Sequence, residues 1–408
     1  MPAYDAIIVG ARVAGSPTAM LLARKGYRVL LVDRDMFPSD TISTHLIHPP
    51  GMAALKRWGV ADVVIATGCP PVSTYRVDFG PFAIVGQPRV DEDAPLAHAP
   101  RRIVLDRILV EAASQAGAEF RESFTVDGLV VEDGVVRGIR GHTKGGAPVS
   151  ERAKVVIGAD GVNSVVARAV GAQAYREVPA KEALYLAYWS NLPADGEFQL
   201  YQRGDRGLAA VPTNDGLTVA LVAWPIEEFE ANRRDLLGNY LLAFETDPTL
   251  AERIRGATRE TRVVGKVMHN FYRQAHGPGW ALVGDAGYHK DAVTAQGISD
   301  AFRDAEALTQ ALESALSDRQ RFASALGAYQ AARDKTTMPM FELTCQLASF
   351  EPPSEEEGQL FAAIAGNRPA ADDFATMLAG IMPVQEFFDP TRLERTLGPE
   401  QLPASSLT

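Results

Sequence analysis

The residues with the clearest chemical meaning stand in the loop GARVAGS, Gly10 to Ser16, directly after the apolar run YDAIIV. The loop keeps the first and last glycines of the phosphate-binding pattern G-x-G-x-x-G. Gly10 permits a tight turn and Gly15 lets a helix pack close to a sheet, so that backbone N–H groups at the helix start face a pyrophosphate. Asp33 follows the next apolar run, where a carboxylate can accept hydrogen bonds from ribose hydroxyls.

Arg12 occupies the place of the second glycine in that pattern. A side chain there crowds the approach of a phosphate, which weakens the match to a strict NAD site. An FAD site is compatible with it, because an extended guanidinium can lie beside the pyrophosphate and pair with it. We therefore predict that Arg12 supplies charge to the pyrophosphate. A plain strand, turn and helix, with Asp33 on the surface, is the alternative that this motif alone leaves open.

Two further stretches place glycine and aspartate after apolar runs. In VVIGADGVNS (155–164), a predicted strand ends at GADG and a helix starts near Ser164. In GWALVGDAG, another predicted strand ends at Gly284 and Asp285, and a long amphipathic helix follows from about residue 297. Either stretch taken alone is also typical of an ordinary turn, because Asp-Gly pairs favour turns.

These motifs, with the helix pattern R-x-x-L-D-x-x-L at 102–109, follow one another in order over residues 4–310. In this order they resemble the FAD-dependent monooxygenases of the aromatic-hydroxylase (para-hydroxybenzoate hydroxylase-like) fold. The subset of that family that carries GARxAG followed by FPSDTxSTH is the most similar, and here the second piece is 37–45. The positions that depart from the family pattern are Gly287, Tyr288, Ala292 and Val293.

The resemblance implies that FAD is the cofactor and that NADPH or NADH is a co-substrate. It implies that Asp285 contacts the ribityl chain, that Arg102 reaches the FAD and that Val126 flanks the adenine. The helix that begins near Gly297 would direct the positive end of its dipole at the flavin pyrimidine. The predicted cofactor-binding residues are Gly10, Arg12, Val13, Ala14, Gly15, Asp33, Arg34, Thr44, Arg102, Val126, Asp160, Gly284, Asp285, Gln296, Gly297 and Ile298.

In the resembled family, NAD(P)H reduces FAD, O₂ adds at flavin C4a, and the hydroperoxide transfers one oxygen atom to an electron-rich substrate. The resemblance implies a small aromatic or polyketide-like substrate, which suits an apolar pocket. His45, His289 and Asp291 are the catalytic candidates, because a histidine near a flavin can donate a hydrogen bond or move a proton near neutral pH. A turn-capping or solvated role is the alternative for these residues, and we favour it for His48.

Three other functions stay open. A flavin reductase similar to the geranylgeranyl reductases shares the fold and reduces isoprenoid double bonds. A flavin-dependent halogenase is less favoured, because the stretch GLAAVPTNDG lacks the tryptophans of the W-x-W-x-x-P signature. A nucleotide-binding scaffold without turnover is the least favoured, because all three FAD motifs are present.

The elements that must position these residues predict an α/β protein. Apolar runs at 4–9 and 28–32, joined by a helix at 14–26, form a β-α-β unit. After residue 180, short strand-like segments broken by Gly, Pro, Asn and Asp indicate an antiparallel sheet, to which 72–86 adds a hairpin. We predict a Rossmann-like FAD-binding domain, an inserted antiparallel substrate domain and a helical C-terminal segment. Their predicted limits are 1–71, 96–180 and 272–344 for the first, 72–95 and 181–271 for the second, and 345–408 for the third.

Within the second domain, residues 228–256 are predicted as helical and 259–271 as one strand. Tyr188 and Trp189 are neighbours on a predicted strand, so they cannot both face the substrate pocket. Residues 320–408 are predicted to be mostly helical, and their position suggests a cap over the substrate entrance.

The net charge of −11 over 408 residues argues against binding to nucleic acid or to an anionic membrane. No apolar run reaches the ~18 residues of a membrane-spanning helix, and the N-terminus lacks the pattern of a signal peptide. Cys69 and Cys345 do not form a disulfide framework, and no metal-ligand spacing is present. We expect a cytoplasmic enzyme without a metal, whose partners are a small-molecule substrate and O₂. The oligomeric state is not indicated.

Overall fold

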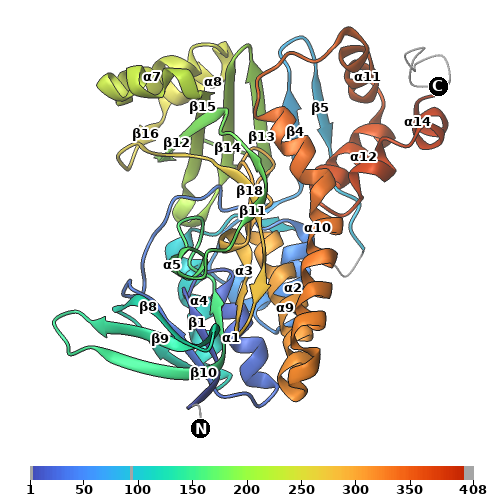
Figure 1. The fold of residues 1–408 in the computed structure, drawn as a ribbon. Coiled ribbons are helices and arrows are strands. Elements are labelled where there is room, and N and C mark those ends of the chain that lie inside the picture. The colour runs from blue at the N-terminus through green and yellow to red at the C-terminus, as the bar shows by residue number, and fades with distance from the viewer. Residues whose placement is uncertain (1–2, 92–94, 399–408) are drawn as a thin grey trace.

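The computed structural model describes residues 3–91 and 95–398. It shows the predicted α/β architecture, with one large sheet at each end of the molecule (Figure 1). The helix α10 (Phe322–Leu347) runs from the first sheet toward the second. Within the described residues, none of the helices has both the length and the apolar character that a membrane crossing requires.

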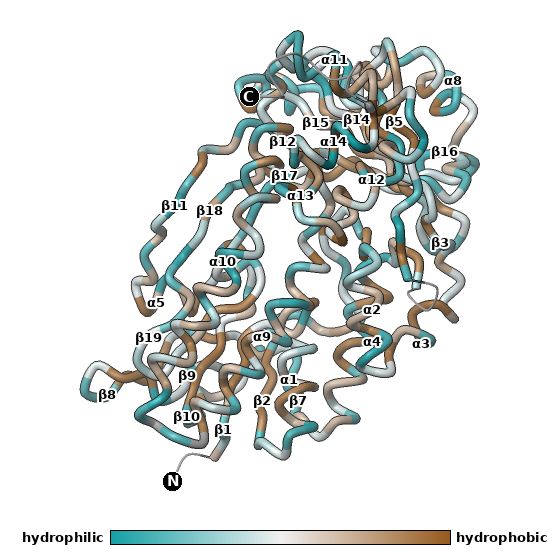
Figure 2. The backbone as a smooth tube through the Cα atoms, turned by 90° about the vertical axis from the view of Figure 1, so that its right-hand side faces the viewer, coloured by the Kyte–Doolittle hydropathy of each residue, from teal (hydrophilic) through white to brown (hydrophobic). Residues whose placement is uncertain are grey.

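The parallel core of the first sheet is apolar because both of its faces are covered. On β1, Ala6 and Ile8 pack among helices, whereas Ile7 and Val9 pack against a β-hairpin and a short helix. Figure 2 shows these central strands in hydrophobic colours. In spatial order the core strands are β20 (Trp280–Leu282), β10 (Val149–Gly158), β1 (Tyr4–Val9), β2 (Val29–Val32) and β7 (Glu119–Arg121). The helices on the first face include α1 (Gly15–Arg24), α2 (Pro49–Arg57), α4 (Arg102–Gln115) and α9 (Gly297–Ser317).

The core strands end side by side. Val9 is paired with both Val32 and Gly158, and Gly158 is paired with Leu282. The loops that follow these residues therefore meet at the carboxyl edge of the parallel strands. In open α/β sheets this edge is where ligands bind.

The hairpin on the other face consists of β8 (Phe124–Glu132) and β9 (Val135–Thr143), beside α5 (Val165–Ala169). Val126 lies inside β8. The strand that ends at GADG begins as early as Val149, because its first half pairs with β9 before its second half enters the parallel core.

The second sheet is the predicted antiparallel meander. The hairpin predicted at 72–86 is present over 74–86 and joins the sheet through a parallel pairing of β4 with β13, whereas Val72 pairs with Ala97 in a separate two-stranded sheet. The sheet order is β16 (Thr258–Arg259), β12 (Glu182–Ser190), β15 (Thr218–Pro225), β14 (Arg206–Pro212), β13 (Glu197–Arg203), β4 (Thr74–Asp78) and β5 (Ala83–Gly86), with β17 (Val264–Val267) also beside β12.

The single strand predicted at 259–271 is wrong, because this segment contributes to two sheets. Arg259 pairs with Trp189 and Val264 pairs with Leu186, which leaves 260–263 outside the ladder on β12. The end of the segment forms β18 in a separate three-stranded sheet. That sheet contains β11 (Ala174–Val178), β18 (Asn270–Arg273) and β21 (Tyr288–His289).

Alternate residues of β12 belong to different cores, as the two-residue period of a strand requires. Leu184, Leu186 and Tyr188 face the interior between the sheets, together with the C-terminal helices. Tyr185 and Trp189 face the opposite side, where they are covered by two helices. Those helices are α7 (Leu236–Phe244) and α8 (Pro248–Gly256).

The described part of the C-terminal region is mostly helical, as predicted, and it packs on the second sheet. A Cβ atom at Gly86 of β5 would lie 2.0 Å from the Ala371 carbonyl oxygen, so the backbones of these two elements touch. The C-terminal helices are α11 (Glu355–Ala365), α12 (Arg368–Leu378), α13 (Val384–Phe387) and α14 (Pro390–Leu397). The remaining helices and strands are α3 (Ala61–Ile65), α6 (Phe229–Asn232), β3 (Pro71–Val72), β6 (Ala97–His98) and β19 (His276–Gly277). The predicted domain limits stay a prediction.

Candidate functional site

A large cavity lies at the carboxyl edge of the first sheet and encloses about 2170 Å³, part of it open to solvent. The three predicted motifs all contribute to its wall. Of the predicted cofactor-binding residues, the ones that line it are Gly10, Arg12, Val13, Ala14, Asp33, Arg34, Thr44, Arg102, Val126, Asp160, Gly284, Asp285, Gly297 and Ile298. Gly15 and Gln296 do not line it.

The first loop comes close to the neighbouring motif because its glycines lack side chains. Gly10 has φ +103°, and a Cβ atom there would lie 2.5 Å from the Ala159 carbonyl oxygen. A Cβ atom at Gly15 would lie 1.8 Å from the Gly10 carbonyl oxygen. Gly15 therefore packs against the backbone of the loop and does not line the cavity. No side chain caps the N-terminus of α1. In its first turn the Ser16 N–H donates to the Arg12 carbonyl at 3.0 Å and Pro17 has no N–H, so an anion would be bound mainly by N–H groups of the preceding loop.

Asp33 is held rigidly at the end of β2. Its Oδ2 atom accepts the Ala11 N–H at 2.7 Å, and its Oδ1 atom accepts the Asp35 N–H at 2.9 Å. Burial raises the pKa of this carboxyl group, while the two backbone hydrogen bonds oppose that shift. Each carboxylate oxygen keeps a second lone pair, which is the feature that a ribose hydroxyl needs.

The Arg12 guanidinium is engaged by the protein itself. It donates to Asp106 at 2.6 Å, to Asp35 at 2.9 Å and to the Ser39 hydroxyl at 3.0 Å. Arg102 shares the same buried Asp106 carboxylate at 2.9 Å. The side chain of Arg12 neither points into solvent nor ends free in the cavity. It ties the first loop to α4 and to the segment after β2, and its contact with a pyrophosphate stays a prediction.

Arg12→Gly is expected to lower the free energy of unfolding by about 1–3 kcal/mol, because it removes charge-assisted hydrogen bonds to Asp106 and Asp35. FAD affinity should change by less than about tenfold, because the loop backbone remains. Denaturant titration and flavin fluorescence titration measure the two effects. Arg107→Ala, which removes an exposed ion pair to Glu111 on the same helix, is the control. Loss of all FAD binding without a loss of stability would contradict the structural role.

Asp160 of the GADG motif caps α5. Its carboxylate accepts the Ser164 hydroxyl at 2.5 Å and the Val165 N–H at 2.6 Å. Burial raises the pKa of this group. Asp160 therefore holds the turn in place, and residues 159–163 of this turn line the cavity.

The third motif presents a carboxylate with no protein partner among the described residues. Asp285 follows Gly284, whose φ is +59° and where a Cβ atom would lie 2.7 Å from the Ala14 side chain. α9 begins at Gly297 without a side-chain cap, and its first residues, Gly297 and Ile298, line the same cavity with their N–H groups unused by a cap. The Gln296 side chain turns away and donates to the Leu378 carbonyl at 2.6 Å. Its predicted contact with the cofactor is therefore replaced by a tether to α12.

His45 lies in the core and not at the cavity wall, and a catalytic role for it stays a prediction. It does not line the cavity, its residue is fully buried, and its Nε2 atom lies 2.7 Å from the Tyr188 hydroxyl oxygen. Burial lowers the pKa of His45 to about 3, and the nearby charges of Arg101 and Arg102 add to this. The ring is a neutral part of the core, which short-range sequence patterns cannot reveal.

The neutral state of His45 predicts an acid-labile apoprotein. The unfolded chain binds a proton at His45 below its ordinary pKa of about 6.5, whereas the folded chain does not until about pH 3. Stability should thus fall as the pH is lowered from 6.5, by up to ~1.4 kcal/mol per unit from this group. His45→Asn, whose side chain tolerates the φ of +64° at this position, should have a shallower slope between pH 6 and pH 4 in denaturant titrations. Parallel slopes would contradict the assignment.

His289 and Asp291 do line the cavity. The His289 ring stacks on Phe271 with ring centroids 5.9 Å apart, and its Nδ1 atom contacts the His269 carbonyl. Burial lowers the pKa of His289 and raises that of Asp291. His48, for which a structural role was favoured, lies buried with Nδ1 2.8 Å from the Tyr75 hydroxyl oxygen. Catalytic roles for His289 and Asp291 stay predictions.

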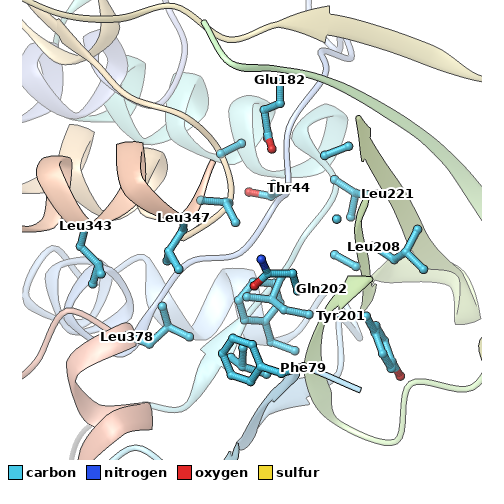
Figure 3. A pocket seen from close by; sticks show the side chains of 18 of the residues that line it. Thr44, Phe79, Glu182, Tyr201, Gln202, Leu208, Leu221, Leu343, Leu347 and Leu378 are labelled. Carbon is cyan, nitrogen blue, oxygen red and sulfur yellow. The ribbon is translucent and has the colours of Figure 1, made fainter. Parts of the chain in front are cut away.

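A second cavity, of about 1090 Å³ and partly open to solvent, lies between the second sheet and the C-terminal helices (Figure 3). Thr44, Leu184 and Ala292 line both cavities, so the two adjoin. The wall is mainly aliphatic and aromatic, and α10, α11 and α12 contribute to it. The helices labelled through Leu343, Leu347 and Leu378 in Figure 3 thus cover this space, as the position of the C-terminal segment suggested.

Sequence reasoning missed Glu182, the one carboxylic acid among the described residues of this wall. It is buried and is the first residue of β12. The signal was available, since Glu182 lies an even number of residues from Leu184 and shares its face. Neither Tyr188 nor Trp189 is among the described residues of this wall, whereas Tyr201 of β13 is.

The residues at the sheet edge suit FAD. The glycine loop admits a pyrophosphate, Asp33 and Asp285 offer carboxylates for hydroxyl groups, and the start of α9 offers N–H donors. This fold and site define an FAD-dependent enzyme of the oxidoreductase class. The chain belongs to the FAD binding domain family, whose model matches residues 3–344.

Several known proteins are similar to this chain. The digeranylgeranylglycerophospholipid reductase of Methanosarcina mazei is 28% identical over 312 residues, which cover 73% of this chain and 72% of that protein. The 6-methylpretetramide 4-monooxygenase of Streptomyces rimosus is 26% identical over 347 residues, which cover 79% of each. Among solved structures, the flavin-dependent brominase Bmp2 has a TM-score of 0.78 at 18% identity, with 92% of this chain and 93% of that chain covered. PqsL of Pseudomonas aeruginosa has a TM-score of 0.70 at 21% identity, with 93% and 99% covered. The structural likeness concerns the fold.

Proposed function

We propose that this protein is an NAD(P)H-dependent flavoprotein monooxygenase that inserts one oxygen atom of O₂ into a small aromatic or polyketide-like molecule. The observation that carries the proposal is the junction of the two cavities. A polar cavity suited to FAD adjoins a mainly apolar one at Thr44, Leu184 and Ala292. A substrate in the apolar cavity would meet the cofactor there, away from bulk water.

The protein's own groups have defined tasks in this proposal. FAD, when bound, supplies the electron transfer and the activation of O₂. Asp285, Asp33 and the glycine loop would hold it, and the dipole of α9 would stabilise negative charge on its reduced ring. The apolar wall excludes water and orients a planar substrate. We also propose a cytoplasmic setting, which the two free cysteines support.

A second candidate is a reductase of isoprenoid double bonds. Its support is the similarity to an archaeal digeranylgeranylglycerophospholipid reductase and the apolar cavity, which also suits a prenyl chain. We favour oxygenation because the similarity to the Streptomyces rimosus monooxygenase extends over more of both chains, and because a carboxylic acid lies in the apolar wall.

The test is a turnover experiment with the purified holoenzyme. NADPH or NADH oxidation and O₂ consumption are followed with phenols, naphthols and polyketide-like aromatics, and products are analysed by mass spectrometry with isotopically labelled O₂. Incorporation of one labelled oxygen atom supports the proposal. Anaerobic saturation of a prenyl double bond without oxygenation in air would overturn it in favour of the reductase. A purified protein that takes up no FAD would overturn both.

A further inference from the structure

Two buried carboxylic acids meet where the two cavities adjoin. Glu182 lines the apolar cavity and Asp291 lines the cavity suited to FAD, and each residue is 2% exposed. Ala292 and Val293, which follow Asp291 in the chain, line the same cavity as Glu182. Each carboxyl group influences the pKa of the other through a side-chain hydrogen bond. Figure 3 shows the Glu182 carboxyl group directed toward Thr44, which borders both cavities. The acids therefore connect the substrate space to the cofactor space.

One proton must be shared between these groups. The Asp291 Oδ1 atom accepts the Val293 N–H at 3.0 Å, but its buried Oδ2 atom has no donor among the described residues. Two carboxylates offer only acceptors, so their hydrogen bond forms only when one of them is protonated. The pair then carries a single negative charge.

The surroundings decide where the proton rests. Burial and the charge of Asp291 raise the pKa of Glu182 well above its ordinary range. Burial also raises the pKa of Asp291, but the backbone N–H groups of Val293 and Ala292 oppose the shift. The proton therefore rests on Glu182 and the charge on Asp291. The charge of Asp291 also affects the pKa of two other titratable groups, His289 of β21 and Cys345 of α10.

The environment of His289 and Cys345 does not supply a stronger base. Burial lowers the pKa of His289; the charge of Asp285 opposes this shift, and the charge of Lys266 on β17 adds to it. Burial raises the pKa of the Cys345 thiol to about 11, so that it stays protonated. Lys290, next to Asp291 in the chain, is paired with Asp300. Asp291 is thus the charged acceptor at this junction.

We propose that Glu182 and Asp291 form a carboxyl relay that takes the hydroxyl proton of a neutral phenol or enol bound in the apolar cavity. The inference rests on the proposed function and names its substrate class. The substrate O–H bond breaks and an O–H bond forms at one oxygen of Glu182. The O–H bond at the other oxygen of Glu182 breaks, and one forms on Asp291. No electrons are exchanged, and the substrate oxygen becomes an anion that activates its ring.

The charges favour a substrate that enters neutral. Before transfer the single negative charge lies on Asp291, and afterwards it lies on the substrate, so the junction holds one charge throughout. Among the described residues that line the apolar cavity, none is Lys, Arg or His. A substrate carboxylate would find no cation there, and its charge would add to that of the pair. Benzoate-type acids should therefore be poor ligands.

The test measures the ionisation of a bound phenol without turnover. 4-Nitrophenol is added to the oxidised holoenzyme at a pH below the pKa of the free phenol, and the bound phenolate is read by difference absorbance. The wild type should bind it largely as phenolate. Glu182→Gln and, as a second variant, Asp291→Asn should lower the ratio of phenolate to phenol at least tenfold. Glu252→Gln, exposed on α8, is the matched control variant. 4-Nitroanisole is the control probe, because its methyl ether has no hydroxyl proton to transfer.

Turnover separates this inference from the proposed function. In both variants kcat/KM for phenol oxygenation should fall about 10²-fold, while FAD occupancy and the anaerobic rate of FAD reduction by NAD(P)H stay at the wild-type level. Equal phenolate fractions in wild type and Glu182→Gln, or a probe that fails to bind, would overturn the relay. Phenolate formation without an oxygenated product would uphold the relay and overturn the monooxygenase. Oxygenation at the wild-type rate by both variants would overturn the relay and uphold the monooxygenase.

Discussion

Gly10→Ala should produce a protein that is destabilised by at least about 3 kcal/mol and purifies without FAD. The φ of +103° at Gly10 strains any other residue by about 1–3 kcal/mol. The added Cβ atom would also lie 2.5 Å from the Ala159 carbonyl oxygen and 2.9 Å from the Asp160 nitrogen. Because both neighbours are backbone atoms at the end of β10, they cannot rotate away. The loop must move out of the position that a pyrophosphate requires.

Gly117→Ala is a closely matched control. Gly117 has the same φ of +103°, but an added Cβ atom there meets nothing within 4 Å. This variant should therefore show the backbone strain alone, with a loss of about 1–2 kcal/mol and full FAD content. Denaturant titration gives the free energies of unfolding, and the ratio of flavin to protein absorbance gives the occupancy. Equal behaviour of the two variants would show that the close approach at Gly10 is irrelevant.

Asp285→Ala should weaken FAD binding by about 10- to 100-fold, which corresponds to the loss of a hydrogen bond to a charged group. The fold should be unaffected, because the Asp285 carboxylate has no hydrogen bond or ion pair among the described residues. A carboxylate that lines a cavity and stabilises nothing in the protein is available for a ligand. Flavin fluorescence titration of the apoprotein measures the dissociation constant.

Two further variants provide the comparison for this measurement, one conservative and one as a control. Asp285→Asn keeps a hydrogen-bonding group of the same size and should retain part of the affinity. Asp62→Ala, exposed in the first turn of α3, removes a carboxylate that is not part of the cavity wall and should bind FAD as the wild type does. An unchanged dissociation constant for Asp285→Ala would show that the third motif does not contact the cofactor.

The first sheet and its binding edge were predictable because their signals are local. A buried strand, a glycine turn and a helix follow one another within about 20 residues, and the parallel order then brings Gly10, Asp33 and Asp285 to one edge. The alternation on β12 was equally accessible, since Tyr188 and Trp189 differ by one residue and must point apart.

The features that could not be predicted depend on contacts between segments that are far apart in the sequence. Glu182 starts β12 and Asp291 lies in the loop after β21, so only the folded chain brings these two residues to one junction. His45 looks like a loop histidine in the sequence, but Tyr188 and the neighbouring core enclose it. Gln296 lies at the start of α9 as expected, but its side chain donates a hydrogen bond to the Leu378 carbonyl of α12. No pattern within a short window encodes such partners.

The alternation along β12 also bears on how this enzyme can diversify. Glu182, Leu184 and Leu186 share the face toward the cavities, whereas Tyr185 and Trp189 anchor the independent core beneath α7 and α8. Of the even-numbered positions, Glu182 and Leu184 line the apolar cavity, so substitutions there would change its shape and polarity while the odd-numbered residues keep the sheet attached to α7 and α8. Changes in this part of the cavity wall and changes in the core beneath α7 and α8 can therefore arise separately.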